Sequence, residues 1–189
     1  NYLAYLKKLG YTSTSSSRSL SAIKSFHKFL YLERRTLDNP AINLASPKLN
    51  KKLPTVLSVD EVMKILDQLN SDTPYNQRNQ AMIELMYATG LRVSELLNLT
   101  LNDIDLENCI IRCIGKGSKE RMIPIGEYVL SSMNNYLERR PKLYIMKRDE
   151  HLFLNNHGKG LSRSSFFKMI KKRLKICKIN VDVSPHTLR

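Results

Sequence analysis

Residues 88–96 have the sequence Ala-Thr-Gly-Leu-Arg-Val-Ser-Glu-Leu and follow an apolar run, residues 81–87, that is typical of a helix. Glycine adopts positive φ freely, so Gly90 predicts the end of that helix. A second helix is expected to begin near Val93. Arg92 would then lie at the junction, where helix-terminal amides and a guanidinium can face one anion.

Arg92 has two interpretations on this pattern. Leu91, Leu96 and Leu99 are expected to be buried, so the arginine is a charged residue held in an apolar stretch. It is either a surface residue paired with Glu95, which is the commoner case, or an anion ligand. Glu95 lies three residues further on the same helical face and can hold the guanidinium in place. Features elsewhere in the chain favour the second interpretation.

The composition predicts a polyanionic partner. The 189 residues include 31 Lys and Arg against 17 Asp and Glu, a formal net charge of +14, which favours nucleic acid over an anionic membrane surface. A hydrophobic fraction of 42% is enough for a packed core. The sequence shows neither a bilayer-spanning apolar run nor a signal peptide, so we expect a cytoplasmic protein without a membrane partner. It also lacks an initiator methionine, and we expect a fragment.

Cysteine usage indicates reduced thiols. Cys109, Cys113 and Cys177 show no zinc-type spacing with histidine. Cys109 and Cys113 fall in one predicted strand, residues 109–114, and would point to the same face, which is poor disulfide geometry. We therefore expect neither a disulfide nor a bound metal or other cofactor.

Residues 1–45 predict a small helical domain, incomplete at its start, with one long helix over residues 12–35. The apolar side chains of that helix recur at three- and four-residue steps and are Leu20, Ile23, Phe26, His27, Leu30 and Tyr31. Residues 46–54 contain two prolines and no acid, which is typical of an extended linker. Such a linker can lie along a phosphate backbone through its lysines, Lys48, Lys51 and Lys52.

Residues 55–189 predict a second domain that is mainly helical with a small β-hairpin and is incomplete at its C-terminus. Helices are expected over residues 58–69 (behind a capping box of Ser58 and Glu61), 77–89 (with Ile83, Met86 and Tyr87 inward) and 127–139.

Residues 109–114 and 121–125 predict the two strands of the hairpin, and residues 151–154 are a short strand candidate. Pro124 favours an edge position for the second strand. The basic residues at and beside the turn are Lys116, Lys119 and Arg121.

Residues 162–179 predict a strongly basic helix without an acidic residue. Its expected buried side is Phe166, Phe167, Ile170, Leu174 and Cys177. So many like charges on one helix repel each other unless an anion screens them. The DNA contacts that we predict on this helix are Arg163, Lys168, Lys171 and Lys172.

A set of residues suited to phosphate chemistry completes the pattern. Arg92 and Arg189 can each chelate a phosphate through a guanidinium fork. Lys116 can donate a proton to a nearby oxygen, and His186, on the same helical face as Arg189, can orient a group or shuttle a proton. These are the groups needed to stabilise a pentacoordinate phosphate without a metal.

On these motifs the chain resembles the tyrosine recombinases, most closely the bacterial Xer recombinases (XerC/XerD type). Residues 88–96 resemble the first-arginine box of that family, and residues 115–121 its catalytic-lysine hairpin. Residues 184–189, Ser-Pro-His-Thr-Leu-Arg, resemble its His-x-x-Arg box. Residues 44–54 are similar to the Xer interdomain linker.

The resemblance implies a two-domain, C-shaped clamp around double-stranded DNA, acting as four recombinase subunits on two DNA sites. It implies cleavage through a 3′-phosphotyrosyl intermediate, and chromosome dimer resolution at a dif-like site. The catalytic residues that it implies are Arg92, Lys116, His186 and Arg189, with Glu95 supporting Arg92. The family's nucleophilic tyrosine lies downstream of the His-x-x-Arg box, so we expect residues 1–189 to lack it.

Three alternatives remain on the sequence. The first is an integrase of a phage or conjugative element from the same family. The second is a non-catalytic DNA-binding protein, although mere phosphate binding does not need a hairpin lysine together with a His-x-x-Arg box. The third is a metal nuclease using Asp103 and Asp105, which are more commonly part of a capped turn.

Overall fold

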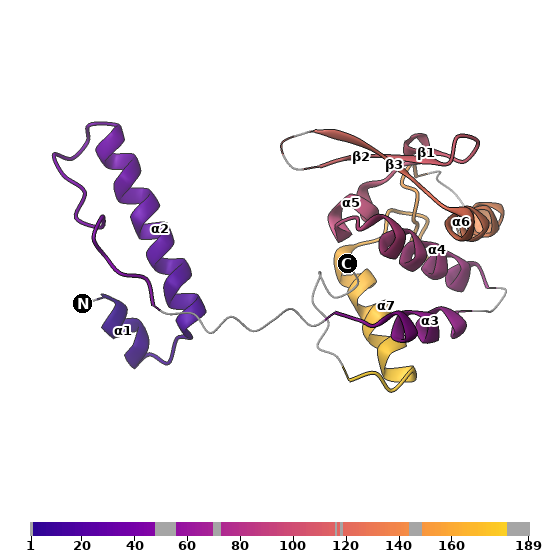
Figure 1. Ribbon diagram of the computed structural model, residues 1–189, viewed down its shortest axis with the longest axis horizontal. Coiled ribbons are helices and arrows are strands. Elements are labelled where there is room, and N and C mark those ends of the chain that lie inside the picture. Colours follow the sequence, from indigo (N-terminus) through magenta and orange to yellow (C-terminus); the bar gives the residue numbers. More distant parts are fainter. Residues whose placement is uncertain are drawn as a thin grey trace. The chain divides into compact units, whose positions relative to one another are not determined.

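The computed structural model describes residues 2–47, 56–69, 73–115, 117, 119–143 and 149–180. The chain divides into two compact units, Asn1–Leu53 and Pro54–Arg189, shown in Figure 1. Six of the candidate site residues lie outside the described residues, namely Lys48, Lys51, Lys52, Lys116, His186 and Arg189. No helix in the described ranges is long and apolar enough to cross a membrane.

The first unit contains α1 (Tyr2–Lys8) and α2 (Ser13–Leu32). Helix α2 begins at Ser13 because the Thr12 hydroxyl accepts a hydrogen bond from the Ser15 N–H at 3.2 Å. Its predicted apolar face is buried only at Leu20, while Phe26 and Tyr31 are 58% and 50% exposed. The other described hydrophobic residues buried in this unit are Leu6 and Ala41. The apolar stripe of α2 is therefore buried at Leu20 and half-buried or exposed at its other positions.

The second unit opens with α3 (Val59–Asp67), whose capping box is the predicted one. The Ser58 hydroxyl accepts the Glu61 N–H at 3.2 Å, and the Glu61 carboxylate accepts the Ser58 N–H at 2.8 Å. These two bonds satisfy amides that the first helical turn leaves without partners. The helix ends two residues before the predicted boundary.

Helix α4 (Pro74–Thr89) begins three residues earlier than predicted. The Thr73 hydroxyl caps it by accepting the Asn76 N–H at 3.3 Å. Pro74 occupies the first turn, where its missing N–H leaves no bond unmade. The Thr73-Pro74 pair is thus the sequence signal for the start of this helix.

Helix α4 is the central element of this unit. Its buried hydrophobic residues are Ala81, Met82, Ile83, Leu85 and Met86. Each fully buried large aliphatic side chain stabilises the fold by roughly 1.5–3 kcal/mol. Tyr87 is 46% exposed, so its predicted inward position is wrong. Helix α4 packs against α6 (Glu127–Arg139), whose bounds are those predicted from the sequence.

Three short antiparallel strands form one sheet in the order β1-β2-β3, at one side of the unit in Figure 1. They are β1 (Ile104–Asp105), β2 (Ile110–Ile114) and β3 (Glu120–Pro124). Strand β3 lies at the edge, as Pro124 predicted. Cys109 has φ 56° and precedes β2, so the prediction that it shares a strand with Cys113 is wrong. Both are free thiols.

Segment 149–160 does not form the predicted strand over residues 151–154. It makes two isolated bridges, Thr100 with His151 and Leu154 with Gly160. Its carbonyl groups accept hydrogen bonds from side chains, where in a sheet they would accept them from a neighbouring strand. The Leu152 oxygen accepts the Tyr136 hydroxyl at 2.8 Å and the Arg140 Nε at 3.1 Å. An apolar run can therefore be buried without a sheet when buried polar side chains replace the ladder.

Two buried arginines contribute to this network. Arg140 is 3% exposed and also donates to the carbonyl groups of Asp149 and His151, each at 2.6 Å. Arg78 is 7% exposed and donates to the Leu154 oxygen at 2.6 Å. The guanidinium N–H groups of both buried arginines thus donate hydrogen bonds to carbonyl oxygens.

The remaining described elements are α5 (Val93–Asn98), two 3₁₀ turns (Leu101–Asp103 and Arg140–Leu143) and α7 (Arg163–Ile176). The buried side of α7 is Phe166, Ile170 and Leu174, with Phe167 and Cys177 partly covered. In Figure 1, α3 and α7 lie on the side of α4 away from the sheet.

Candidate active site

The break between α4 and α5 has the geometry that the sequence predicts. Gly90 adopts φ 62° and ψ 24°, and its N–H donates to the Met86 oxygen at 3.0 Å to close the last turn of α4. Leu91 and Leu96 are 0% exposed and Leu99 is 2% exposed. The segment is therefore anchored on both sides of Arg92, which immediately precedes the first residue of α5.

Glu95 holds Arg92 with both of its carboxylate oxygens. Oε2 accepts the backbone N–H of Arg92 at 2.8 Å, and Oε1 accepts its guanidinium Nη1 at 2.8 Å. The Glu95 side chain is 7% exposed, whereas the Arg92 side chain is 43% exposed. The fixed carboxylate thus directs a guanidinium whose other N–H groups remain accessible.

Arg121 brings a second guanidinium to the same carboxylate. Its Nη2 donates to Glu95 Oε2 at 3.0 Å from strand β3. Arg121 lies opposite Cys113 in the sheet, and Cys113 is 3% exposed, so the two side chains share the inner face. We predicted Arg121 as a DNA contact but did not predict this bond. The two residues are 26 apart in sequence, so no local pattern indicates their contact.

The charges around Glu95 keep it ionised. Burial by itself raises the pKa of Glu95, but the two hydrogen bonds from Arg92 and the positive charge of Arg121 lower it by more. The net result is a pKa below the usual glutamate value. The cluster therefore consists of one carboxylate and two guanidiniums and has a net charge of +1 near neutral pH.

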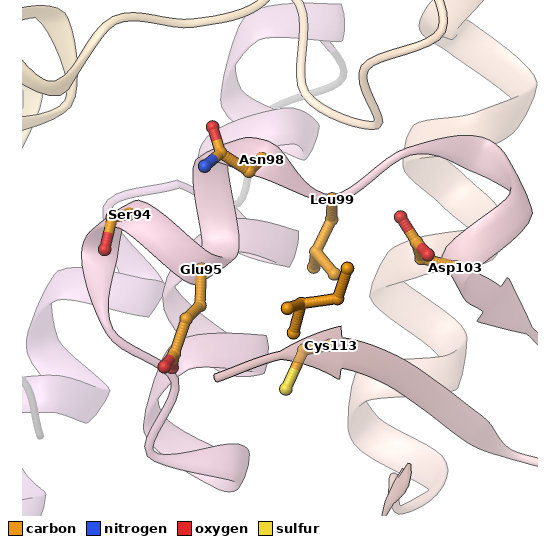
Figure 2. A pocket seen from close by; sticks show the side chains of 7 residues that line it. Ser94, Glu95, Asn98, Leu99, Asp103 and Cys113 are labelled. Carbon is orange, nitrogen blue, oxygen red and sulfur yellow. The ribbon is translucent and has the colours of Figure 1, made fainter. Parts of the chain in front are cut away.

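A pocket of about 320 Å³ lies beside Glu95, between α5 and the sheet. Figure 2 shows Glu95 at one end of this pocket and Asp103 at the other, with Leu99 and Cys113 between them. The Asp103 carboxylate accepts the Thr100 N–H at 2.8 Å and its hydroxyl at 2.7 Å. Asp103 is thus a capping residue of the 3₁₀ turn that follows Thr100.

Asp105, the second acid of the metal-nuclease alternative, also belongs to a turn. Its carboxylate accepts the Asn108 N–H at 2.9 Å and the Asn108 side-chain amide at 2.8 Å. Within the described residues, no three His, Cys, Asp or Glu side chains converge as metal ligands would. The local hydrogen bonds account for both aspartates without a ligand role.

The structure brings together Arg92, Glu95 and Arg121 from the predicted set. Lys116, His186 and Arg189 lie outside the described residues, so their positions relative to Arg92 stay predictions. Lys119 is exposed, and its carbonyl accepts the Gly115 N–H at 2.8 Å, which closes the base of the hairpin loop.

Helix α7 presents a basic outer face. Helical geometry places Lys168, Lys171, Lys172 and Lys175 opposite the buried residues, and all four are exposed. Arg163 lies over the Phe167 ring with its guanidinium carbon 5.7 Å from the centroid.

Arg173 differs from its basic neighbours on α7. It donates to the Asn76 side chain at 2.6 Å and to the Gln68 carbonyl at 3.4 Å. This arginine connects α7 to the end of α3 and the start of α4.

Known sequences match the chain along its length. The sequence pattern of the phage integrase family matches residues 55–189, and the N-terminal SAM-like domain of phage integrases matches residues 1–34. Tyrosine recombinase XerD of Halalkalibacterium halodurans is 44% identical over 100% of this chain, and XerD of Staphylococcus aureus is 43% identical over 99%. This chain spans 64% of the length of each relative.

Solved structures agree with these matches. The crystal structure of XerA recombinase is 31% identical with a TM-score of 0.63, covering 99% of this chain and 63% of that one. XerH recombinase in a post-cleavage complex with its palindromic difH substrate is 23% identical with a TM-score of 0.75, covering 98% and 56%. The latter likeness concerns the fold alone. Because the match over residues 55–189 covers most of the sequence, this chain belongs to the phage integrase family, the tyrosine recombinases that its motifs resemble.

Proposed function

We propose that this chain is the larger part of a site-specific tyrosine recombinase that cuts and rejoins double-stranded DNA. The observation that carries the proposal is Arg92, held by both oxygens of Glu95 at an anchored helix break, beside the strand that leads from the Lys116 hairpin. A guanidinium fixed in this way is suited to binding the scissile phosphate.

In the proposed reaction, a tyrosine hydroxyl attacks phosphorus and the P–O5′ bond breaks, leaving a 3′-phosphotyrosyl link and a free 5′-hydroxyl. Arg92 and Arg189 stabilise the charge on the non-bridging oxygens. Lys116 gives a proton to the leaving 5′-oxygen, and His186 orients or shuttles the proton of the attacking hydroxyl. The covalent link conserves the energy of the broken bond, and attack by a 5′-hydroxyl reverses the step.

The proposed partner is duplex DNA held between the two units as a C-shaped clamp. The lysines of α7 support this proposal because they form one exposed face without an acid. The remaining contacts proposed from the sequence are Lys119, Arg163 and the linker lysines Lys48, Lys51 and Lys52. Strand exchange would require four subunits on two DNA sites.

The relatives named XerD support a chromosomal role, because each of the two described above is more than 40% identical across nearly the whole chain. We infer that the protein acts in the cytoplasm on a dif-like site and resolves chromosome dimers. A mobile-element integrase would instead act on the ends of its own element.

A nicked suicide duplex carrying the chromosome's dif-like site tests this function. The nick lets the short fragment beyond the cleavage site diffuse away, so the covalent intermediate accumulates. The full-length protein should give a protein–DNA band that survives denaturation and is sensitive to protease. Cleavage that leaves only free DNA ends would point to a nuclease. Reversible binding without a covalent band would point to a non-catalytic DNA-binding protein.

A further inference from the structure

We propose that Arg121 is a positioning residue for phosphate binding: it holds Glu95 from the β-hairpin and thereby directs the guanidinium of Arg92. The inference deepens the proposed function and rests on it. It assigns Arg121 to the chemistry of the Arg92 site and not to the outer DNA-contacting surface.

The contact geometry supports an indirect role. The described hydrogen bonds to the Glu95 carboxylate come from the Arg92 backbone, the Arg92 side chain and Arg121. The first two arise within α5 and its N-terminal junction. Arg121 is the described donor that comes from the sheet, 26 residues away in sequence. Its bond therefore connects two separate elements at this carboxylate.

The bond from Arg121 to Glu95 also determines the net charge near Arg92. The Glu95 side chain is 7% exposed and the Arg121 side chain is 42% exposed, so the carboxylate is largely shielded from water while Arg121 is not. Without Arg121, the negative charge of Glu95 would offset the charge of Arg92, and a phosphate would meet a neutral pair. With Arg121, the cluster keeps a net charge of +1, which attracts a phosphate. Arg121 thus compensates Glu95 and leaves the charge of Arg92 available to the DNA.

The Arg121 side chain packs closely against the backbone of the hairpin at Gly115. A Cβ atom on Gly115 would lie 3.3 Å from Arg121 Nε and 3.7 Å from its Cζ. Gly115 also donates to the Lys119 carbonyl at 2.8 Å, which sets the base of the loop containing Lys116. The bond from Arg121 to Glu95 therefore fixes the stem of that loop against α5. Arg121 therefore contacts both the stem of the hairpin and the carboxylate that holds Arg92.

Loss of Arg121 has a signature that a merely structural residue would lack. The positive charge of Arg121 lowers the pKa of Glu95, so its removal should raise that pKa. Protonated Glu95 can no longer accept both bonds from Arg92. In a plot of cleavage rate against pH, the fall in rate on the acidic side should therefore move to higher pH in an Arg121→Ala variant.

The test compares Arg121→Ala, Arg121→Lys and Arg112→Ala in the full-length protein. Arg112 is the matched control because it lies in the same hairpin but bonds to the Asn102 carbonyl at 2.9 Å and pairs with Glu120 at 3.6 Å. Carbon-13 NMR of labelled glutamate follows the titration of Glu95. Single-turnover formation of the covalent complex is measured across pH, and DNA affinity is measured by gel shift. Thermal unfolding verifies that each variant is folded.

Arg121→Ala should raise the pKa of Glu95 and slow cleavage about tenfold near neutral pH, less than removal of a donor to the phosphate itself. DNA affinity should change less than twofold to threefold, and Arg112→Ala should match the wild type. Arg121→Lys should restore much of the Glu95 titration, because its charge is kept. The proposal is overturned by an unchanged pKa of Glu95, or by a loss of affinity as large as the loss of cleavage. A wild-type protein that never cleaves would refute the proposed function, while the Glu95 titration would still test the link to Arg121.

Discussion

Arg92 is bound twice by Glu95, through its backbone N–H to Oε2 and through its guanidinium to Oε1, each at 2.8 Å. The bond from the Arg92 backbone N–H keeps the Glu95 carboxylate in place even when the Arg92 guanidinium moves. The guanidinium therefore has a preferred direction before any DNA arrives. Preorganised donors of this kind need no rearrangement when charge develops in the transition state.

Arg92→Ala should abolish most cleavage in the full-length protein and leave duplex binding nearly intact. Losing one donor to a developing charge typically costs on the order of a hundredfold or more in rate. Binding should survive because the proposed interface contains many other cations that would contact the backbone. Single-turnover cleavage and gel shifts on one DNA site measure the two effects. Arg92→Lys is the companion variant, since lysine keeps the charge but not the fork. Wild-type cleavage by Arg92→Ala would exclude this residue from the chemistry.

Lys116→Ala should be rescued by a DNA substrate whose 5′-bridging oxygen at the scissile phosphate is replaced by sulfur. A thiolate leaves without a proton, so the variant no longer needs the acid. Cleavage rates of wild type and variant on both substrates provide the measurement. Arg92→Ala serves as the control, because sulfur should not replace charge stabilisation on the non-bridging oxygens. If Lys116→Ala lowers the cleavage rate equally on the oxygen and sulfur substrates, Lys116 is not the acid that protonates the leaving oxygen.

Residues 1–189 should bind duplex DNA reversibly and not cut it. Several phosphates would be neutralised by the basic face of α7 and by the linker lysines, so affinity should fall steeply as salt rises. Replacing Lys168, Lys171 and Lys172 by glutamine should flatten that dependence. Gel shifts at several salt concentrations give the slope.

Cleavage needs a hydroxyl held within about 3–3.5 Å of phosphorus and opposite the leaving oxygen. We expect that hydroxyl from a tyrosine downstream of Arg189, so a chain extended past this residue should trap a covalent band on a nicked suicide duplex. A covalent band from residues 1–189 alone would mean that a tyrosine between Tyr2 and Tyr144 is the nucleophile, contrary to the mapping onto the family.

Acid should destabilise the second unit through Asp149. Hydrogen bonds from the His151 N–H and the His151 ring, the latter at 2.6 Å, lower the pKa of Asp149 to about 2. A pKa depressed by folding means that this contribution to the free energy of unfolding is complete above the unfolded pKa. It is lost as pH falls from about 4 towards 2. Urea unfolding across that range should show a shallower pH dependence in Asp149→Asn. Glu150→Gln, an exposed neighbour, is the control and should match the wild type.

The sequence was sufficient where one local rule determines the structure. Gly90 predicted the left-handed end of α4, and Ser58 and Glu61 predicted the start of α3. The helix expected over residues 127–139 has the bounds of α6. Prediction from the sequence failed where contacts with residues far away in the chain determine the local structure. Strand β1 is too short to show an alternation.

Two further failures have the same physical origin. The apolar run over residues 151–154 is typical of a strand, yet the side chains of Tyr136 and Arg140 take the place of a neighbouring strand. The Arg121–Glu95 bond joins residues 26 apart, and no local pattern indicates it. The Arg92–Glu95 contact could be anticipated because both residues lie within one helical turn.

Gly160 lies where a Cβ atom would approach His151 Cγ to 2.8 Å. The imidazole cannot simply rotate away, since its Nδ1 is bound to Asp149 and the Gly160 N–H itself donates to the other oxygen of that carboxylate at 3.1 Å. These positions therefore constrain one another's evolution. A side chain at 160 becomes acceptable only after the ring at 151 has been lost, and a mutational scan should find alanine at 160 tolerated in a His151→Gly background and rejected in the native one.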